Sequence, residues 1–326
     1  MYTPSANFLA RFGKPVLIYA NIMAVIETIA PIFLIIVFGY VIRKKGFLSE
    51  RFISDANRFV FLFPLPVMIF SGIVKSNASD VSLSRLLAVI VPTLAMAGFA
   101  FLLGSALKLK KGKLGSFVQT TFHGNVSYIG LAVLFYMLGE IGLKKGSILI
   151  GLLILVNNAL AIGTLSWASG QHRNVSRALI SIVKNPVIVA TYLGTAFLFL
   201  GIKLPPVILR SMGILANLAL PMALIVIGAS MTVGTVKYSF KLSSVITVSK
   251  LFLLPGLSVL FCRLFAIPYQ DGLPGIILLA TPTATTSYIL ARELDGDPDL
   301  ASGAITLSTL VSPLAYVLWA SAGTAL

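Results

Sequence analysis

The residues best suited to chemistry lie in a short polar stretch within an otherwise apolar segment. His123, Gly124, Asn125 and Ser127 stand close together there. Glycine permits non-helical backbone, and an amide or a hydroxyl can bond freed peptide groups or a solute. A helix interrupted at this point would leave a half-helix whose amino end carries unpaired N–H groups and a partial positive charge. Such an end favours an anion.

A second polar stretch later in the chain offers the same ingredients. Pro282 cannot donate a backbone hydrogen bond, and Thr283, Thr285 and Ser287 place hydroxyl groups around it. We predict that the two stretches meet near the middle of a membrane and that their polar residues form a binding site, where the helix ends favour an anion. The competing interpretation is that hydroxyl-rich stretches only allow helices to pack closely.

Lys250 is the remaining candidate for this site, because an ionisable residue deep in an apolar segment is costly and often functional. It lies about 13 Å along a helix from Lys241, at a rise of roughly 1.5 Å per residue. It could attract the anion, pair with a carboxylate, or reach back to the membrane surface. His123 could serve proton coupling, substrate binding or a purely structural role.

The elements that carry these residues are predicted to be membrane-spanning helices. The chain has 326 residues, of which 57% are hydrophobic and 11% charged, and its mean hydropathy is +0.98. These values exclude an ordinary soluble domain. Lipid offers no partner to backbone polar groups, so helices are expected, each of roughly 20 residues. We predict an all-α integral membrane protein with about ten spans, at 23–42, 58–74, 84–107, 115–138, 147–168, 185–201, 206–233, 242–262, 273–291 and 301–321.

The formal net charge of +15 is unevenly distributed between the two sets of alternate loops. By the positive-inside rule the richer set is cytoplasmic, which places both termini on the non-cytoplasmic side of the cell or plasma membrane. The charge therefore follows membrane topology, and we expect the lipid bilayer as a partner and no nucleic acid. The basic residues of the richer set are Arg43, Lys44, Lys45, Arg51, Arg58, Lys108, Lys110, Lys111, Lys113, Arg173, Arg177, Lys184, Lys237, Lys241 and Arg292.

An internal duplication relates the two polar stretches. The tripeptide Ser127-Tyr128-Ile129 recurs 160 positions later as Ser287-Tyr288-Ile289, and Trp167-Ala168-Ser169 is matched by Trp319-Ala320-Ser321. We predict two repeats, at 23–169 and 185–323, joined by a cytoplasmic linker at 170–184. About five spans in each repeat make the second repeat inverted relative to the first. Residues 1–22 are expected to be an interfacial extension, or to precede a translation start at Met23.

Motifs of other chemistries are missing from the sequence. Cys262 is the single cysteine, so no disulfide can form within the chain, and we find no zinc-hydrolase histidine pair, nucleophile elbow or phosphate-binding glycine loop. We therefore expect no enzyme activity, no metal site and no cofactor. Coupling to protons or to sodium stays open.

Several local motifs resemble those of the auxin efflux carrier family, within the bile/arsenite/riboflavin transporter superfamily. The resemblance covers nearly the whole chain from about Met23. It rests on Pro31-Ile32-Phe33 with Gly39-Tyr40, on Leu65-Pro66, on Gly124-Asn125 with Tyr128-Ile129-Gly130, on Pro221 with Gly228-Ala229-Ser230, on Lys250-Leu251 with Pro255, and on Pro282 with Gly296-Asp297-Pro298-Asp299-Leu300-Ala301.

This resemblance implies a ten-span, five-plus-five inverted repeat similar to bile-acid sodium symporters, with spans four and nine unwound and crossing. Asn125 would lie at the first crossing and Pro282 at the second. The resemblance also implies export of organic anions, which are auxin in plant members and dicarboxylates such as malate or malonate in bacterial members. Spans one, two, six and seven would form a scaffold, often a homodimer, and the other spans would move.

The chain departs from the family pattern in two places. Ala132 stands where many members have a proline, which predicts a different shape for the first crossing and weakens the inference of a substrate from the family. The short linker at 170–184 replaces the long loop of plant auxin exporters, which favours a small carboxylate over auxin. We predict an exporter of a small organic anion that works by alternating access. The alternatives are a sodium-coupled symporter and a membrane-embedded metabolite sensor without transport.

Overall fold

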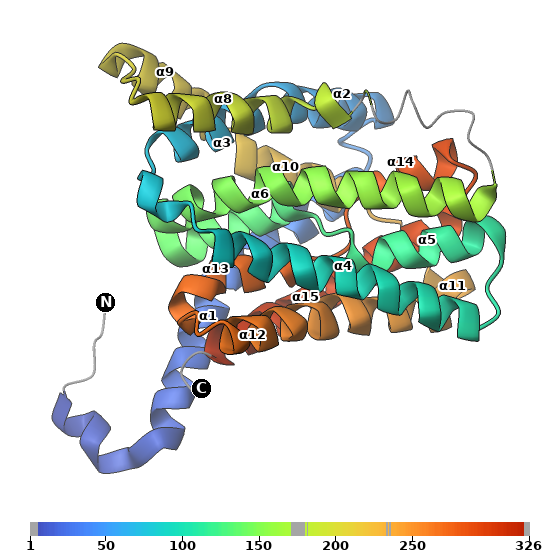
Figure 1. Ribbon diagram of the computed structural model, residues 1–326, viewed down its shortest axis with the longest axis horizontal. Helices are drawn as coiled ribbons and strands as arrows, with labels where there is room; N and C mark the ends of the chain where they lie inside the picture. The colour runs from blue at the N-terminus through green and yellow to red at the C-terminus, as the bar shows by residue number, and fades with distance from the viewer. Residues whose placement is uncertain (1–5, 171–179, 181, 233, 235, 323–326) are drawn as a thin grey trace.

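Helices run side by side along the length of the molecule (Figure 1). The computed structural model describes residues 6–170, 180, 182–232, 234 and 236–322, and this part of the chain contains no β-strand. Seven of its helices are long and apolar enough to cross a membrane, and Pro186–Leu200 (α8) is a shorter apolar helix. The predicted all-α membrane fold is confirmed. The number of ten spans stays a prediction.

One group of helices packs around the first span. Helix α1 packs against α10, and α3 packs against both α8 and α9. Phe63 separates α2 from α3, which begins at Pro64, so the proline interrupts this span as its missing N–H requires. The bounds are Ala6–Lys44 (α1), Glu50–Leu62 (α2), Pro64–Val74 (α3), Pro206–Ala216 (α9) and Ala219–Ser230 (α10).

Two glycines allow α1 and α10 to touch through their backbones. A Cβ atom on Gly39 would lie 2.3 Å from the carbonyl oxygen of Ile225, and one on Gly228 would lie 1.8 Å from that of Ile36. Both distances are far below van der Waals contact, so neither position accepts a side chain. Small residues bring membrane helices together in this way.

The other helices form a second group. Helix α4 packs against α5 and α12, and α11 packs against α15. Gly139 has φ 61° and ψ −144°, which divides the long helix α6 into two segments close to the predicted boundary at 138. The bounds are Leu83–Ala106 (α4), Lys111–Phe122 (α5), Leu131–Ser169 (α6), Val236–Val248 (α11), Leu254–Leu264 (α12), Tyr269–Leu279 (α13), Thr286–Glu293 (α14) and Pro298–Ala322 (α15).

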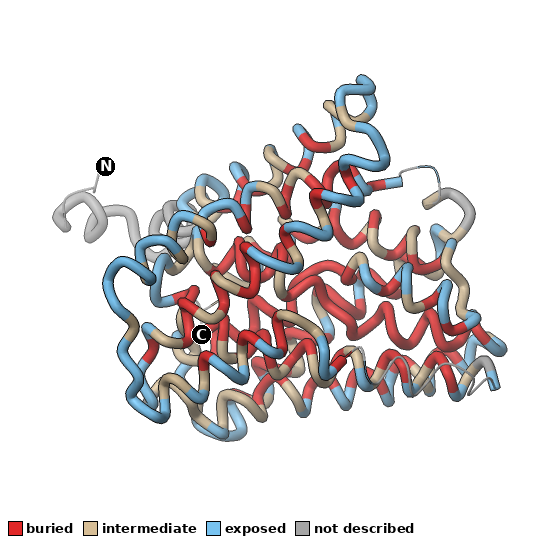
Figure 2. Tube along the Cα trace, turned by 90° about the horizontal axis from the view of Figure 1, so that it is seen from above, coloured by how far each residue is buried: buried red, intermediate tan, exposed pale blue. Residues whose placement is uncertain are grey.

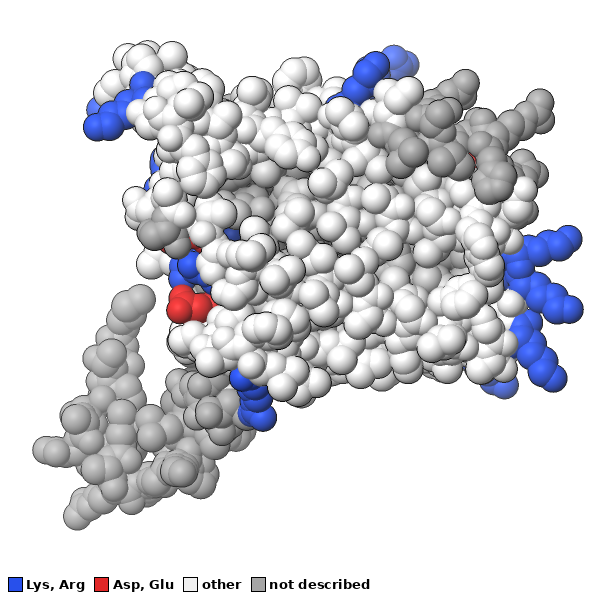
Figure 3. Space-filling view, in the orientation of Figure 1, with Lys and Arg blue, Asp and Glu red and all other residues white. Residues whose placement is uncertain are grey.

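The surface separates into an apolar flank and two charged ends. Buried residues follow the middle of the bundle, and exposed residues follow its outer helices (Figure 2). The flank in Figure 3 is almost free of charge, and lysines gather at the end where α4 turns into α5, where Lys108, Lys110 and Lys111 are exposed. At the opposite end Lys145 pairs with Asp271 at 3.1 Å. This pattern fits an integral membrane protein.

Some sequence predictions concern parts of the chain that the structure does not describe. Most of the linker predicted at 170–184 lies outside the described residues. The extension predicted at 1–22, the division into two repeats and the sidedness of the termini stay predictions.

Candidate functional site

The first polar stretch interrupts a helix as predicted. Helix α5 ends at Phe122, and the backbone is extended at His123, with φ −75° and ψ 95°. A short π-helical turn, η2 (Val126–Gly130), then leads directly into α6. The N–H of Gly130 donates to the carbonyl of Asn125 at 3.0 Å, which closes this turn.

The second polar stretch interrupts another helix, and the two interruptions pair with each other. Helix α13 ends at Leu279 and α14 begins at Thr286. Between them the backbone forms an isolated antiparallel bridge from Thr283 to Gly124. The N–H of Asn125 donates to the carbonyl of Pro282 at 2.8 Å, and the N–H of Ala284 donates to that of His123 at 2.9 Å. The predicted meeting of the two stretches is therefore observed.

Side chains satisfy other backbone groups that the interruptions release. The Thr283 hydroxyl donates to the carbonyl of Thr120 at 2.9 Å, and the Thr283 N–H donates to the Ser308 hydroxyl at 3.0 Å. The Gln119 amide donates to the carbonyl of Ser287 at 2.9 Å. Buried polar groups need such partners, so these side chains hold the two interrupted stretches together. The region where the two stretches meet is the crossing.

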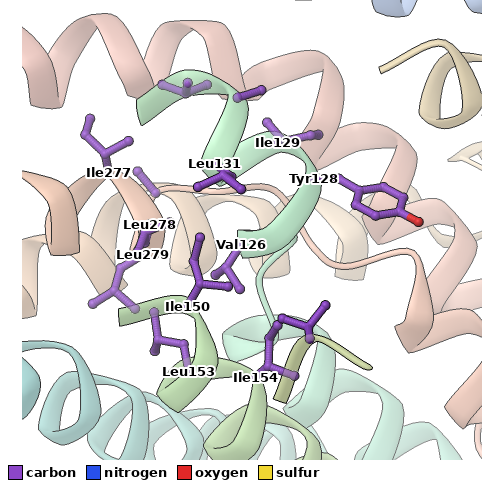
Figure 4. Packing of buried hydrophobic residues seen from close by; sticks show 14 of the residues in the cluster. Val126, Tyr128, Ile129, Leu131, Ile150, Leu153, Ile154, Ile277, Leu278 and Leu279 are labelled. Atoms are coloured by element: carbon purple, nitrogen blue, oxygen red, sulfur yellow. The ribbon is translucent and has the colours of Figure 1, made fainter. Parts of the chain in front are cut away.

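Apolar packing fixes the crossing from one side. Figure 4 shows Leu278 and Leu279, from the end of α13, close to Leu131 and the η2 turn. Tyr128 points away from this cluster. Its hydroxyl lies 3.0 Å from the Asn57 side-chain oxygen on α2, so one hydrogen bond joins the crossing to the first group of helices.

A cavity of about 650 Å³ lies beside the crossing, between helices of both groups. Five of the predicted site residues line it, and four do not: Pro282, Thr283, Ser287 and Lys250 lie outside the lining. Pro282 and Thr283 belong to the bridge itself, whereas Ser287 is buried within α14. The five that line the cavity are His123, Gly124, Asn125, Ser127 and Thr285.

The amino ends of both interrupted helices face this cavity. Val126 and Ser127, at the start of the η2 turn, and Thr285 and Thr286, at the start of α14, all contribute to its lining. The first N–H groups of a helix have no partner within the helix and carry partial positive charge. The cavity is therefore suited to an anion.

Two asparagine side chains offer hydrogen bonds to a ligand. Asn125 is 6% exposed, and within the described part of the chain its side-chain amide has no hydrogen-bond partner. Asn157 on α6 is 2% exposed, and its side-chain oxygen finds no partner among the described residues. Sequence reasoning missed Asn157, although the pair Asn157-Asn158 inside an apolar span was a signal for it. Asn57, Asn158 and Asn185 also line the cavity.

Charged residues mark the mouth of the cavity. Arg43 at the end of α1 forms an ion pair with Glu50 and donates to the carbonyl of Ala229 at 2.6 Å. The Glu50 side chain is 80% exposed, and Asp299 at the start of α15 is also exposed. Arg43 and Glu50 belong to the end of the molecule predicted to be cytoplasmic.

Lys250 lies behind the crossing rather than in the cavity. It is fully buried on a second π-helical turn, η4 (Ser249–Leu253), and its Nζ donates to the carbonyl of Leu279 at 2.6 Å. Among the described residues no cluster of three His, Cys, Asp or Glu side chains could hold a metal ion.

The family model described as "Membrane transport protein" matches residues 24–168 and 168–320. The chain belongs to this family. The predicted resemblance to the auxin efflux carriers is thereby confirmed, since the membrane transport protein family contains them. Membrane transport is the activity that the description of this family gives.

Relatives in the membrane transport protein family match along almost their entire length. A transporter of Methanocaldococcus jannaschii is 24% identical over 91% of this chain and 98% of its own. A transporter of Methanothermobacter thermautotrophicus is 26% identical over 90% of this chain and 96% of its own. A protein of Rhizobium meliloti, whose name proposes malonate as its transported substrate, is 23% identical over 87% and 91%.

Proposed function

We propose that this membrane transport protein is a secondary transporter that exports a small organic anion, with a dicarboxylate such as malonate or malate as the leading candidate. The observation that carries the proposal is the cavity at the crossing, which brings two helix amino ends together with the side chains of Asn125 and Asn157. The name of the Rhizobium relative agrees with this substrate class.

At the crossing, amides, hydroxyls and helix ends would bind the anion, whereas Arg43 at the mouth of the cavity is already paired with Glu50. Neutral donors neutralise a carboxylate less completely than arginine does, so binding stays weak enough for release on the far side. The cavity volume of about 650 Å³ falls within the usual range for small-molecule sites, roughly 300–1,000 Å³. Water would fill the space that a small dicarboxylate leaves.

The grouping of the helices supports alternating access. Helices α1, α2, α3, α8, α9 and α10 would form the scaffold, and the crossing would move with α4, α5, α6 and α11 to α15. The cavity lies at the boundary, with Asn57 and Val226 on the scaffold side and Asn125 and Thr306 on the other. Rocking one group against the other would expose the same residues to the opposite side of the membrane.

The sidedness and assembly follow from the sequence predictions. The mouth beside Arg43 would open to the cytoplasm, and both termini would lie on the opposite side. A homodimer through spans one, two, six and seven would use the exposed apolar side chains of α8 and α9, such as Leu200 and Val207.

Flux measurements test the proposal directly. Purified protein in proteoliposomes is assayed for uptake and efflux of labelled malonate, malate, acetate and indole-3-acetate. We expect the dicarboxylates to be transported best, and Asn125→Ala to reduce their flux by at least about tenfold, since a hydrogen bond to a charged group contributes roughly 1.5–3 kcal/mol.

Asn217→Ala is the matched control, because Asn217 is exposed at the end of α9 and lies outside the cavity lining. Equal flux in wild type and Asn125→Ala would remove Asn125 from the mechanism. Specific binding of an organic acid without any flux would favour the sensor alternative.

A further inference from the structure

Lys250 is a basic residue for which the described part of the structure offers no counter-ion. Its side chain is fully buried, and within the described part of the chain no carboxylate lies within ion-pair distance of it. The one hydrogen bond of its Nζ goes to the carbonyl of Leu279, at 2.6 Å. A buried charge is costly unless it is paired or hydrogen-bonded, so this position needs a reason.

The Lys250 amine lies at the carboxyl end of α13 and beside Gly124, which follows the carboxyl end of α5 by two residues. Leu279 is the last residue of α13, and Phe122 is the last residue of α5, next to the bridge. A Cβ atom on Gly124 would lie 3.0 Å from the Lys250 Nζ and 2.3 Å from the Thr281 hydroxyl, so Lys250 packs directly on both interruptions. Carboxyl ends of helices carry partial negative charge and favour a cation.

In transporters with interrupted helices, such carboxyl ends and unwound carbonyls coordinate a coupling ion such as Na⁺. We propose that the Lys250 ammonium takes the place of that ion, as a cation covalently tethered to the protein. A tethered cation cannot dissociate, so the crossing is complete without sodium. One consequence is that flux needs no sodium gradient, and this consequence rests on the proposed function. The other is that the folded protein needs no sodium for its stability, and this consequence is independent of the proposed function.

A π-helical turn positions Lys250 beside the crossing. Lys250 belongs to the π-helical turn η4, which ends one residue before α12 and two residues before Pro255. A π-helical turn adds one residue to a helix and rotates the side chains that follow, and such turns are frequent at functional sites. Removal of the ammonium would leave a small space bounded by the Leu279 carbonyl and the Thr281 hydroxyl.

Substrate-free thermal unfolding in detergent tests the tethered cation. We expect wild-type protein to unfold at the same temperature in sodium chloride and in N-methylglucamine chloride. Lys250→Ala is expected to lower the midpoint by on the order of 5–10 °C. Methylammonium or sodium should restore part of that loss by filling the vacated space, whereas Lys250→Met, which fills the space with an apolar chain, should show no rescue.

Lys145→Ala is the control, since Lys145 pairs with Asp271 at the end of the molecule and should respond to neither cation. A wild-type midpoint or dicarboxylate flux that requires sodium would overturn the proposal, as would Lys250→Ala with unchanged stability. The sodium dependence of wild type decides the matter if Lys250→Ala gives no folded protein. Because stability is measured without substrate, loss of flux in Asn125→Ala and loss of stability here are separate outcomes.

Discussion

At the scale of single residues, asparagine determines what the cavity can recognise. An amide donates to a carboxylate and accepts from a hydroxyl, so it suits hydroxylated and plain dicarboxylates equally. Asn125 lies at the start of the η2 turn, and Asn157 reaches the same cavity from α6. The two belong to different segments of the chain, so a ligand that bonds to both would be held by the η2 turn and by α6 together.

Substitution of Asn157 should weaken substrate binding without unfolding the protein. We expect Asn157→Ala to raise the KM for the transported dicarboxylate about five- to tenfold, the loss of roughly 1 kcal/mol of hydrogen bonding. Asn157→Asp should raise it further, because its carboxylate repels the anion. Concentration series of proteoliposome flux provide the measurement. An unchanged KM in both variants would show that Asn157 serves only packing.

At the scale of elements, the crossing depends on Gly124. This glycine lies between the two interrupted helices, directly against the side chains of Lys250 and Thr281. The space around Gly124 admits no Cβ atom, whereas a Cβ on Gly98 in α4 would meet nothing within 4 Å. These two glycines differ in their surroundings and allow a matched comparison.

Gly124→Ala should destabilise the protein by about 1–3 kcal/mol, because overpacking forces the bridge to shift. Flux should fall with it, since the bridge positions Asn125. Gly98→Ala should leave the unfolding midpoint unchanged or raise it slightly, because alanine favours the helix by about 0.5–1 kcal/mol. Thermal unfolding of both variants in detergent is the measurement, and equal midpoints would argue against a tight crossing.

Local signals explain how far the sequence predicted these elements. Pro282 and Gly124 each stand among polar residues within an apolar segment, and this combination allowed both interruptions to be located without a structure. The hydrogen-bond partner of Lys250 could not be located from the sequence, because Leu279 is distant in the chain and meets Lys250 only through tertiary packing. Tertiary packing also decides which way a hydroxyl points. Thr283 and Ser287 were predicted to face the ligand, but both lie outside the cavity lining. The hydroxyl of Thr283 holds the crossing instead.

At the scale of the whole molecule, transport requires the two groups of helices to move against each other. The Thr232 and Ser302 hydroxyls lie 2.7 Å apart, one following α10 and the other on α15, so they join the groups at the mouth of the cavity. The two side chains meet directly, so these positions are suitable for a cysteine pair that tests whether a covalent link between the groups stops transport.

Cysteines at both positions should stop transport when they are oxidised to a disulfide. The variant is Thr232→Cys/Ser302→Cys, and it also carries Cys262→Ser so that no other thiol remains. Reduction should restore the rate measured before oxidation, because only the covalent link is removed. Flux before oxidation, after it and after reduction gives the comparison. Full flux in the cross-linked protein would contradict relative motion of the two groups.

The bridge between Gly124 and Thr283 has the form of a contact between identical subunits. Asn125 donates to Pro282, and Ala284 donates to His123, so each stretch gives and receives one hydrogen bond, as two copies about a two-fold axis do. If the two halves descend from one ancestor, as the repeated tripeptide predicts, two half-length chains inserted in opposite orientations would already have made this contact as a dimer. Fusion of the two genes would then have joined chains that already made this contact. After fusion, the side chains of each half could change independently of those of the other half.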